Sequence, residues 1–250
     1  MTMNQGDQNR GEFTSGAGAS RFSIVVPVYR EQGLINRCLA QVNSLQRIRE
    51  AEVIVADGDG GSTVSAIEGQ SYAFTLKKVL SPMGRGVQQN RGAAAAGTEI
   101  LIFLHVDTRI PHKALSLIEE VLCGYAAGAF SLGIDSPRGF LKLGERLANL
   151  RSRITRIPYG DQVLFMRRDT FLSLGGFQEI PLMEDVALAL ELRRRGIPIH
   201  ILREKTCTSD RRWREEGAVR GTVRNWMIYT LFRLGVSPDR IIEYYRPHTS

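Results

Sequence analysis

The stretch ILIFLHVDTRIP, residues 100–111, joins five apolar residues directly to polar ones. The apolar part predicts a buried strand, and His105 and Asp107 follow it at positions i and i+2. In an extended chain these two side chains point to the same side. A carboxylate in that place suits a divalent metal that bridges the phosphates of a nucleotide, with His105 beside it. The structural alternative makes Asp107 a turn residue before Pro111.

Similar apolar runs recur along the chain and alternate with helical patterns. The run FSIVVPV, residues 22–28, predicts another short strand, and residues 34–45 repeat apolar side chains at helical spacing. The other expected strands cover residues 53–56, 76–80, 128–134, 162–167 and 198–202, and the other expected helices cover residues 86–96, 113–122, 140–154, 185–195 and 217–234. This alternation predicts an α/β fold with a mostly parallel central sheet and helices on both faces.

Polar residues also follow the first two strands at their carboxyl ends. Pro27, Tyr29 and Glu31 belong to the end of the first strand, and Asp57 and Asp59 follow the second. In open α/β sheets the ligand crevice lies outside these strand ends, so we expect the residues to share one crevice with the His-Val-Asp sequence. Carboxylates there suit the N–H groups of a nucleobase or the hydroxyls of a ribose. An ordinary strand-to-helix turn is the alternative.

Composition places the chain among globular proteins. It has 250 residues, of which 43% are hydrophobic and 24% charged, and no run of about 18 apolar residues that predicts a membrane span. Residues 1–20 are polar and glycine-rich, which predicts a disordered tail and a cytoplasmic location. Cys38, Cys123 and Cys207 include no Cys-x-x-Cys pair, so we expect reduced thiols and not a disulfide framework or a zinc site.

Positive charge is concentrated near the C-terminus. The net charge is +7, and nine arginines and one lysine fall between Arg193 and Arg224. This bias predicts an anionic partner, which nucleic acid, an acidic lipid surface or a diphosphate compound would each satisfy. Nucleic acid is the least favoured, because few aromatic residues suit base stacking and the carboxylates would repel phosphate. The basic helix expected at residues 217–234 predicts a contact with an anionic membrane surface.

Two further motifs carry charged residues to the starts of helices. GRGVQQNRG, residues 84–92, has Gln89 where a dinucleotide-binding motif has its third glycine, so a dehydrogenase is disfavoured. The motif leaves Arg85 near a helix start, where it suits a diphosphate or is a solvated loop arginine. Glu184 and Asp185 begin another expected helix. The helix dipole favours acidic residues there, and the same place suits a general base.

The ordered set VVPVYRE, ADGDGGST, GRGVQQNRGAAAAG, ILIFLHVDT, GDQVLFMRR, LMEDVALALELRRRG and RRW resembles the family 2 glycosyltransferases. Within that family the chain is similar to the short bacterial branch of 4,4'-diaponeurosporenoate glycosyltransferase-like proteins. The resemblance implies the GT-A fold, with a nucleotide-sugar-binding and catalytic domain over residues 21–205. A basic C-terminal helical segment, residues 206–250, is expected to pack on or beside that domain.

The resemblance also implies roles for single residues. Asp107 matches the metal-holding last Asp of the family's Asp-x-Asp motif, and His105 stands where the family has the first Asp. Asp185 matches the catalytic base, and Glu184, beside it near the acceptor, is implied as the second catalytic residue. The residues implied to bind the nucleotide-sugar, taken to be a UDP-sugar, are Pro27, Tyr29, Glu31, Asp57, Asp59, Arg85 and His105. Those implied on the acceptor or diphosphate side are Asp161, Gln162, Arg212 and Trp213.

The function expected from the resemblance is an inverting glycosyl transfer that depends on Mn²⁺ or Mg²⁺. The sugar would pass from a nucleotide-diphospho-sugar to a hydroxyl acceptor, with a lipid or carotenoid among the candidates, at the inner face of the membrane. One alternative is a nucleotidyltransferase, which needs a lysine- and glycine-rich phosphate loop where this chain has PVYREQG. The other is a non-catalytic basic protein that binds nucleic acid or lipid.

Overall fold

A computed structural model describes residues 20–69, 71–209 and 218–242. The predicted tail, apart from Ser20, lies outside the described residues, and so do Arg212 and Trp213. Within the described part no helix combines the length and the apolar character that crossing a bilayer requires. All three cysteines are free thiols.

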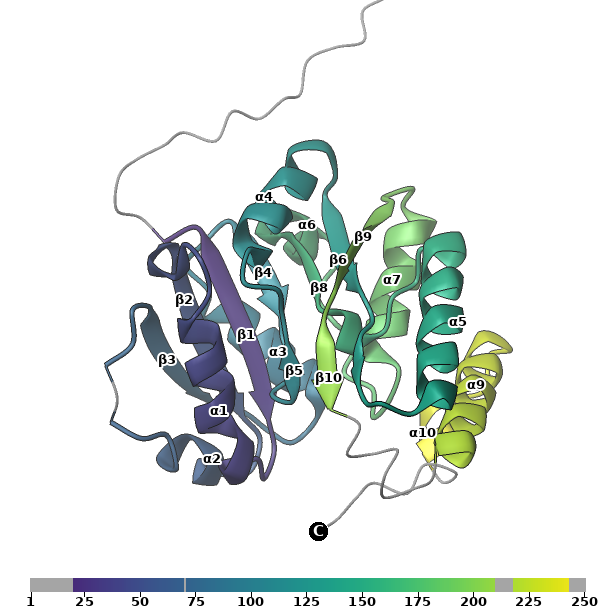
Figure 1. Ribbon diagram of the computed structural model, residues 1–250, viewed down its shortest axis with the longest axis horizontal. Helices are drawn as coiled ribbons and strands as arrows, with labels where there is room; N and C mark the ends of the chain where they lie inside the picture. The colour runs from purple at the N-terminus through teal and green to yellow at the C-terminus, as the bar shows by residue number, and fades with distance from the viewer. Residues whose placement is uncertain (1–19, 70, 210–217, 243–250) are drawn as a thin grey trace, which may run out of the picture.

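Seven strands form the central sheet in the order β3-β2-β1-β4-β8-β6-β9 (Figure 1). Each strand is parallel to its neighbours, except that β8 is antiparallel to both β4 and β6. The predicted mostly parallel sheet is therefore confirmed. The strands are β1 (Phe22–Val28), β2 (Ala51–Asp57), β3 (Thr75–Leu80), β4 (Ile100–Phe103), β6 (Ala127–Ser131), β8 (Leu164–Arg167) and β9 (Ile199–Lys205).

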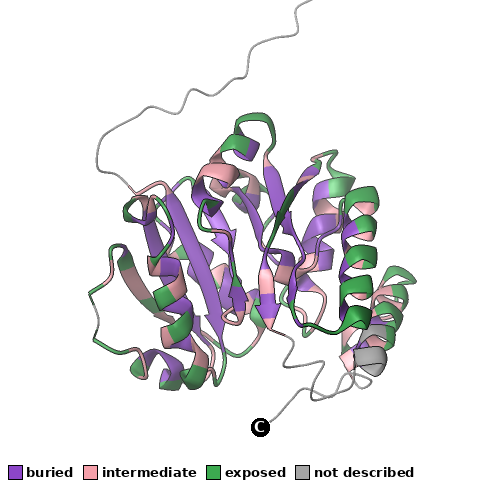
Figure 2. Cartoon of the chain, in the orientation of Figure 1, coloured by how far each residue is buried: buried purple, intermediate pink, exposed green. Residues whose placement is uncertain are grey.

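Helices cover both faces of this sheet, as predicted. Alternate residues of β1 enter different cores: Ile24 and Val26 pack with Leu39 on one face, and Val25 packs on the other. Both faces are buried, which explains why β1 is a continuous apolar run and not an alternating one (Figure 2). The first core is covered by α1 (Gln32–Asn43) and α4 (Ala114–Gly124), and the second by α3 (Arg85–Ala94), α6 (Arg168–Ser173) and α7 (Glu184–Arg194).

The strand predicted over residues 128–134 is wrong as a single element. β6 ends at Ser131, and β7 (Ile134–Asp135) belongs to a second, three-stranded sheet with β5 (Thr108–Arg109) and β10 (Cys207–Ser209). The chain changes sheets at Gly133, where a Cβ atom would lie 2.0 Å from the carbonyl oxygen of Thr206. Only glycine permits that close approach of two backbones.

The strand predicted over residues 162–167 also begins later than expected. Residues Gly160–Gln162 form a 3-10 turn, η2, and β8 starts after Val163, whose φ is 51°. The short elements α2 (Ser62–Ser65) and η1 (Ile48–Glu50) complete the N-terminal half. In the C-terminal half, α5 (Gly139–Thr155), α9 (Ala218–Arg233) and α10 (Pro238–Ile242) lie together at one end of the molecule (Figure 1).

Candidate active site

The first two parallel strands end level with each other, because Val28 of β1 pairs with Asp57 of β2. Asp57 is buried, and its two carboxylate oxygens accept hydrogen bonds from the backbone N–H groups of Asp59 and Val64, both at 2.8 Å. Burial raises the pKa of Asp57, and the neighbouring Asp59 adds to the shift. Asp57 therefore holds the β2–α2 turn in shape, and its predicted contact with a base stays a prediction.

Asp59 ties this turn to the loop after β1. Its Oδ1 accepts the N–H groups of Ser62 and Thr63, and its Oδ2 accepts the N–H of Arg30 at 2.7 Å. Burial alone would raise the pKa of Asp59, but hydrogen bonds with Asp57, Ser62 and Thr63 outweigh it and lower the pKa. The carboxylate therefore stays ionised and fixes the two loops side by side.

The residues predicted after β1 lie on this joined pair of loops. Pro27 is buried opposite Ala56, whereas the Tyr29 ring is exposed, with the Arg30 guanidinium 5.2 Å from its centre. The N–H of Glu31 donates to the hydroxyl of Thr63 at 3.1 Å. The structure thus brings together the five residues expected at the ends of the first two strands, which are Pro27, Tyr29, Glu31, Asp57 and Asp59.

A cavity of about 130 Å³ is lined by Asp107 after β4 and by Arg85 at the start of α3, and we call it the central cavity. It is lined by residues from six separate parts of the chain. The predicted site residues that line it are Arg85, His105, Asp107, Asp161 and Asp185. Gln162 does not line it; this side chain is buried and bonds to Ser152, Phe130 and Tyr159.

Glu184 and Asp185 open helix α7 at the wall of the central cavity. Asp185 Oδ2 accepts the N–H of Gly160 at 2.5 Å, and Oδ1 accepts the N–H of Val186 at 2.7 Å. Burial raises the pKa of Asp185, and the Arg85 charge and these two N–H groups act against the shift. Burial likewise raises the pKa of Glu184, whose Oε1 lies 3.4 Å from a guanidinium nitrogen of Arg85. The positive charge of Arg85 thus stabilises the ionised forms of Glu184 and Asp185 against the effect of burial.

His105 packs on the backbone that holds Asp185. A Cβ atom on Gly160 would lie 2.6 Å from Cε1 and 2.7 Å from Nε2 of the imidazole. The absence of a side chain at Gly160 therefore lets the ring lie directly against the turn whose N–H binds Asp185. Gly160 is not among the residues predicted from the sequence, although Tyr-Gly-Asp-Gln at residues 159–162 is a signal for a tight turn.

Tyr159 is a second lining residue that sequence analysis missed. The Arg151 guanidinium lies 3.8 Å from the centre of its ring, and the Tyr229 ring of α9 lies edge-on at 6.0 Å. Burial raises the pKa of Tyr159, so its hydroxyl stays protonated. Asn225 and Ile228 of α9 also line the central cavity. Helix α9 therefore forms one wall of the site.

The donor set suits a metal that arrives with a diphosphate. Among the described residues, no three His, Cys, Asp or Glu side chains converge to form a protein cage for an ion. Of the carboxylates that line the central cavity, Asp107 lies on the same short segment after β4 as the His105 imidazole. Mg²⁺ is typically bound by one or two carboxylates together with substrate phosphates and water. The residues present therefore fit such an ion.

A family model described as "Glycosyl transferase family 2" matches residues 23–172, more than half of the chain. The chain belongs to glycosyl transferase family 2. This membership confirms the family predicted from the motifs and disfavours the nucleotidyltransferase and the non-catalytic binding protein. No curated protein matches the chain, and the resemblance to the diaponeurosporenoate branch stays a prediction.

Solved structures of glycosyltransferases share the fold. S. aureus TarS, residues 1–349, has a TM-score of 0.62 at 18% identity, over 76% of this chain and 60% of that one. The mannosyltransferase PcManGT from Pyrobaculum calidifontis, in complex with GDP-Man and Mn²⁺, has a TM-score of 0.63 at 22% identity, over 84% of this chain and 60% of that one. TarS is also known in complex with UDP-GlcNAc. The GT-A fold is confirmed, and the matched region spans about 60% of these structures.

Proposed function

We propose that this protein transfers a sugar from a nucleotide-diphospho-sugar to a hydroxyl group. The observation that carries the proposal is the convergence of Arg85, Asp107 and Asp185 on one cavity at the carboxyl ends of the parallel strands. A cation, a metal-binding carboxylate and a partly buried carboxylate base are the groups that such a transfer needs. Family membership supports the same reaction class.

The nucleoside half of the donor is assigned to the joined loops. Tyr29 offers an exposed ring for stacking, and Glu31 and Asp59 lie on the same loops with Asp57 and Pro27 beneath them. Arg85, at the start of α3, is assigned to the diphosphate, where its charge and the helix dipole both favour an anion. UDP-sugars are our first choice, and the UDP-GlcNAc complex of TarS supports it, while the GDP-Man complex of PcManGT makes GDP-sugars the second.

Asp107, with His105 beside it, is assigned to a divalent ion, Mn²⁺ or Mg²⁺. When bound, the ion would supply positive charge that stabilises the leaving diphosphate. Arg85 supplies charge of the same sign from the protein itself. The Mn²⁺ in the PcManGT complex supports this assignment.

Asp185 is assigned as the general base. The acceptor oxygen forms a bond to the anomeric carbon while the bond from that carbon to the diphosphate oxygen breaks, and the leaving oxygen keeps the electron pair. The acceptor's proton passes to the Asp185 carboxylate. A single displacement from the opposite face inverts the anomeric centre. Burial favours this role because a raised pKa makes a carboxylate a stronger base.

Glu184 is assigned a positioning role, because its carboxylate pairs with Arg85 and does not line the central cavity. Asp161 lines the cavity on the side of α9, which we assign to the acceptor. Gln162 supports that side from beneath through Ser152 and Tyr159. Arg212 and Trp213 remain assigned to the acceptor or diphosphate side from the sequence alone. A lipid or carotenoid acceptor and action at the cytoplasmic side of a membrane are part of the proposal.

Ligand-induced thermal shifts test the donor half. The full chain would be melted with UDP, GDP, dTDP and their sugars, each with Mn²⁺, Mg²⁺ or EDTA. We expect one nucleotide class to raise the melting temperature, with the metal and not with EDTA; a ligand at 100 times its Kd adds about 2.7 kcal/mol. Stabilisation by none of these compounds, or by UTP, GTP or dTTP as a comparison set but not by the diphosphates or their sugars, would contradict the proposal.

A further inference from the structure

Helix α5 has its polar and apolar faces reversed relative to an ordinary surface helix. Its inward residues Glu145, Asn149 and Ser152 are buried and hydrogen-bonded to the backbone or to other side chains, and Leu141 is the one large apolar residue buried with them. Its outward large apolar residues are Phe140, Leu143, Leu147, Leu150 and Ile154, all of which are exposed. Surface helices of globular proteins normally turn the apolar stripe toward the core. Folding of this chain therefore does not account for the outer row.

The row forms a continuous stripe along the helix. The spacing alternates between three and four residues, so at 100° per residue the five side chains fall within an arc of about 80°. From Phe140 to Ile154 the stripe runs for about 21 Å, at 1.5 Å per residue. Ile154 is 72% exposed, which excludes the core of this molecule as its partner.

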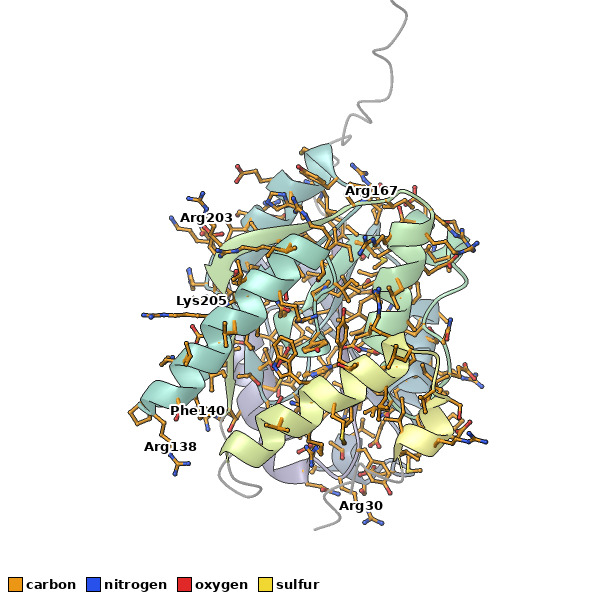
Figure 3. All side chains as sticks on the ribbon, turned by 90° about the vertical axis from the view of Figure 1, so that its right-hand side faces the viewer. Arg30, Arg138, Phe140, Arg167, Arg203 and Lys205 are labelled. Atoms are coloured by element: carbon orange, nitrogen blue, oxygen red, sulfur yellow. The ribbon has the colours of Figure 1, made fainter. Side chains whose placement is uncertain are left out.

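Helix α9 continues the apolar surface. It packs against α5, and the two helices lie side by side across one end of the molecule (Figure 3). Val223, Trp226 and Met227 of α9 are exposed there. We call these residues and the α5 stripe together the α5–α9 face. Tryptophan is enriched where proteins meet the interface of a bilayer.

Basic residues flank one side of the stripe. Lys142, Arg146 and Arg153 lie next to it on the α5 helical wheel and are exposed. On the same side of α5, Arg138, Arg203 and Lys205 extend outward (Figure 3). The only acidic residue of α5, Glu145, is buried and bonded to Lys142 and Lys205, so it offers no negative charge outside.

We propose that the α5–α9 face lies on an anionic lipid bilayer, with the apolar stripe in the acyl boundary and the basic flank on the headgroups. In-plane amphipathic helices bind in this way, by apolar burial together with attraction to anionic lipid. A second copy of the chain is a poorer occupant, because its α5 would present the same cations and no exposed carboxylate to pair with them. The sequence predicted membrane contact at residues 217–234; the structure shifts most of the contact to α5.

The face also leads toward the central cavity. A smaller cavity of about 70 Å³ opens between α5 and α9, lined by apolar residues that include Leu132, Leu141 and Trp226. It shares Tyr159, Asp161 and Asn225 with the central cavity. An amphiphile in the membrane would thus reach Asp185 with its hydroxyl while its apolar part stays between the helices. This assigns a membrane-borne amphiphilic alcohol as the acceptor, and that part rests on the proposed function.

Vesicle co-sedimentation of the full chain tests the face. Vesicles of phosphatidylcholine alone would be compared with vesicles in which phosphatidylglycerol is about a third of the lipid. We expect binding to the anionic vesicles, a loss of at least about 10-fold for the double variant Leu147→Glu/Leu150→Glu, and a loss of about fivefold for Arg146→Gln. The matched controls Leu172→Glu on α6 and Arg49→Gln, both exposed elsewhere, should bind as the wild type does.

Each other outcome overturns the inference. Wild-type protein that stays in the supernatant, or a double variant that binds as well as Leu172→Glu, shows that the α5–α9 face does not bind lipid. A dimer in solution that the double variant turns into a monomer assigns the face to a second copy. Donor-induced thermal shifts, measured without vesicles, separate the two proposals: failure of vesicle binding alone sinks this inference, and failure of the thermal shift alone sinks the proposed function.

Discussion

Substitution of Gly160 by alanine should disable turnover through a single steric contact. The new Cβ would lie 2.6 Å from Cε1 of His105, whereas carbon atoms in contact lie about 3.5 Å apart, so the ring or the turn must move by about 1 Å. The turn carries the N–H that donates to Asp185. A 1 Å misplacement costs about 100-fold in rate, which is about 2.7 kcal/mol of transition-state stabilisation.

The assay measures kcat and KM for transfer or donor hydrolysis, together with the melting temperature. We expect kcat to fall about 100-fold; KM for the donor should change less than kcat, because the nucleoside loops and Asp107 are not in the contact, although His105 is. Gly124→Ala at the end of α4 is the matched control, because a Cβ there meets nothing within 4 Å. It should leave kcat unchanged.

A double-mutant cycle identifies the route of the effect. His105→Ala removes the ring that the new methyl group would strike, so Gly160→Ala should cost much less in that background than in the wild type. If the loss were equally large in both backgrounds, or if Gly160→Ala kept the wild-type kcat, the steric reasoning would be refuted.

Two further predictions follow from ionised groups. Because Asp185 acts as a base only when ionised and burial raises its pKa, kcat should fall as the pH drops through a value above the ordinary aspartate pKa of about 4; a pH–rate profile that stays flat down to pH ~4 would contradict this. Glu145→Gln should lower the free energy of unfolding by about 1–3 kcal/mol, because an amide cannot accept hydrogen bonds from all three donors, Lys205, Lys142 and the N–H of Ile134. The control Glu204→Gln changes an exposed carboxylate and should leave the free energy of unfolding unchanged. Hydrogen bonds from these three partners outweigh burial and lower the pKa of Glu145 in the folded protein. Its contribution to the free energy of unfolding is therefore present above the unfolded pKa of about 4.3 and is lost as the pH falls through the lower, folded pKa. Denaturant unfolding at two pH values should show a smaller difference between wild type and Glu145→Gln in acid.

Most of the sheet could be predicted because its strands are short apolar runs. The bounds predicted for β1 and β4 agree with the structure nearly to the residue, since a short apolar run that ends at polar residues is typical of a strand buried on both faces. The error at residues 128–134 has a long-range cause. The chain leaves the sheet there because its backbone passes against Thr206, and no local pattern encodes a neighbour more than 70 residues away.

The candidate site could be predicted where it follows strand ends. Asp57, Asp59 and Asp107 come directly after apolar runs, so the topology alone brings them to one edge of the sheet. Tyr159 and Gly160 could not be found this way, because they reach the site through packing between η2, α5 and α9. The outward stripe of α5 was also missed, because apolar residues at helical spacing predict a helix without showing which face is turned inward.

The most direct test of the central claim compares Asp107→Asn with Asp185→Asn by isothermal titration of the donor and by turnover. Our account predicts that Asp107→Asn loses metal-dependent donor binding. It predicts that Asp185→Asn binds the donor as the wild type does and loses turnover. Wild-type turnover by Asp185→Asn would contradict the account.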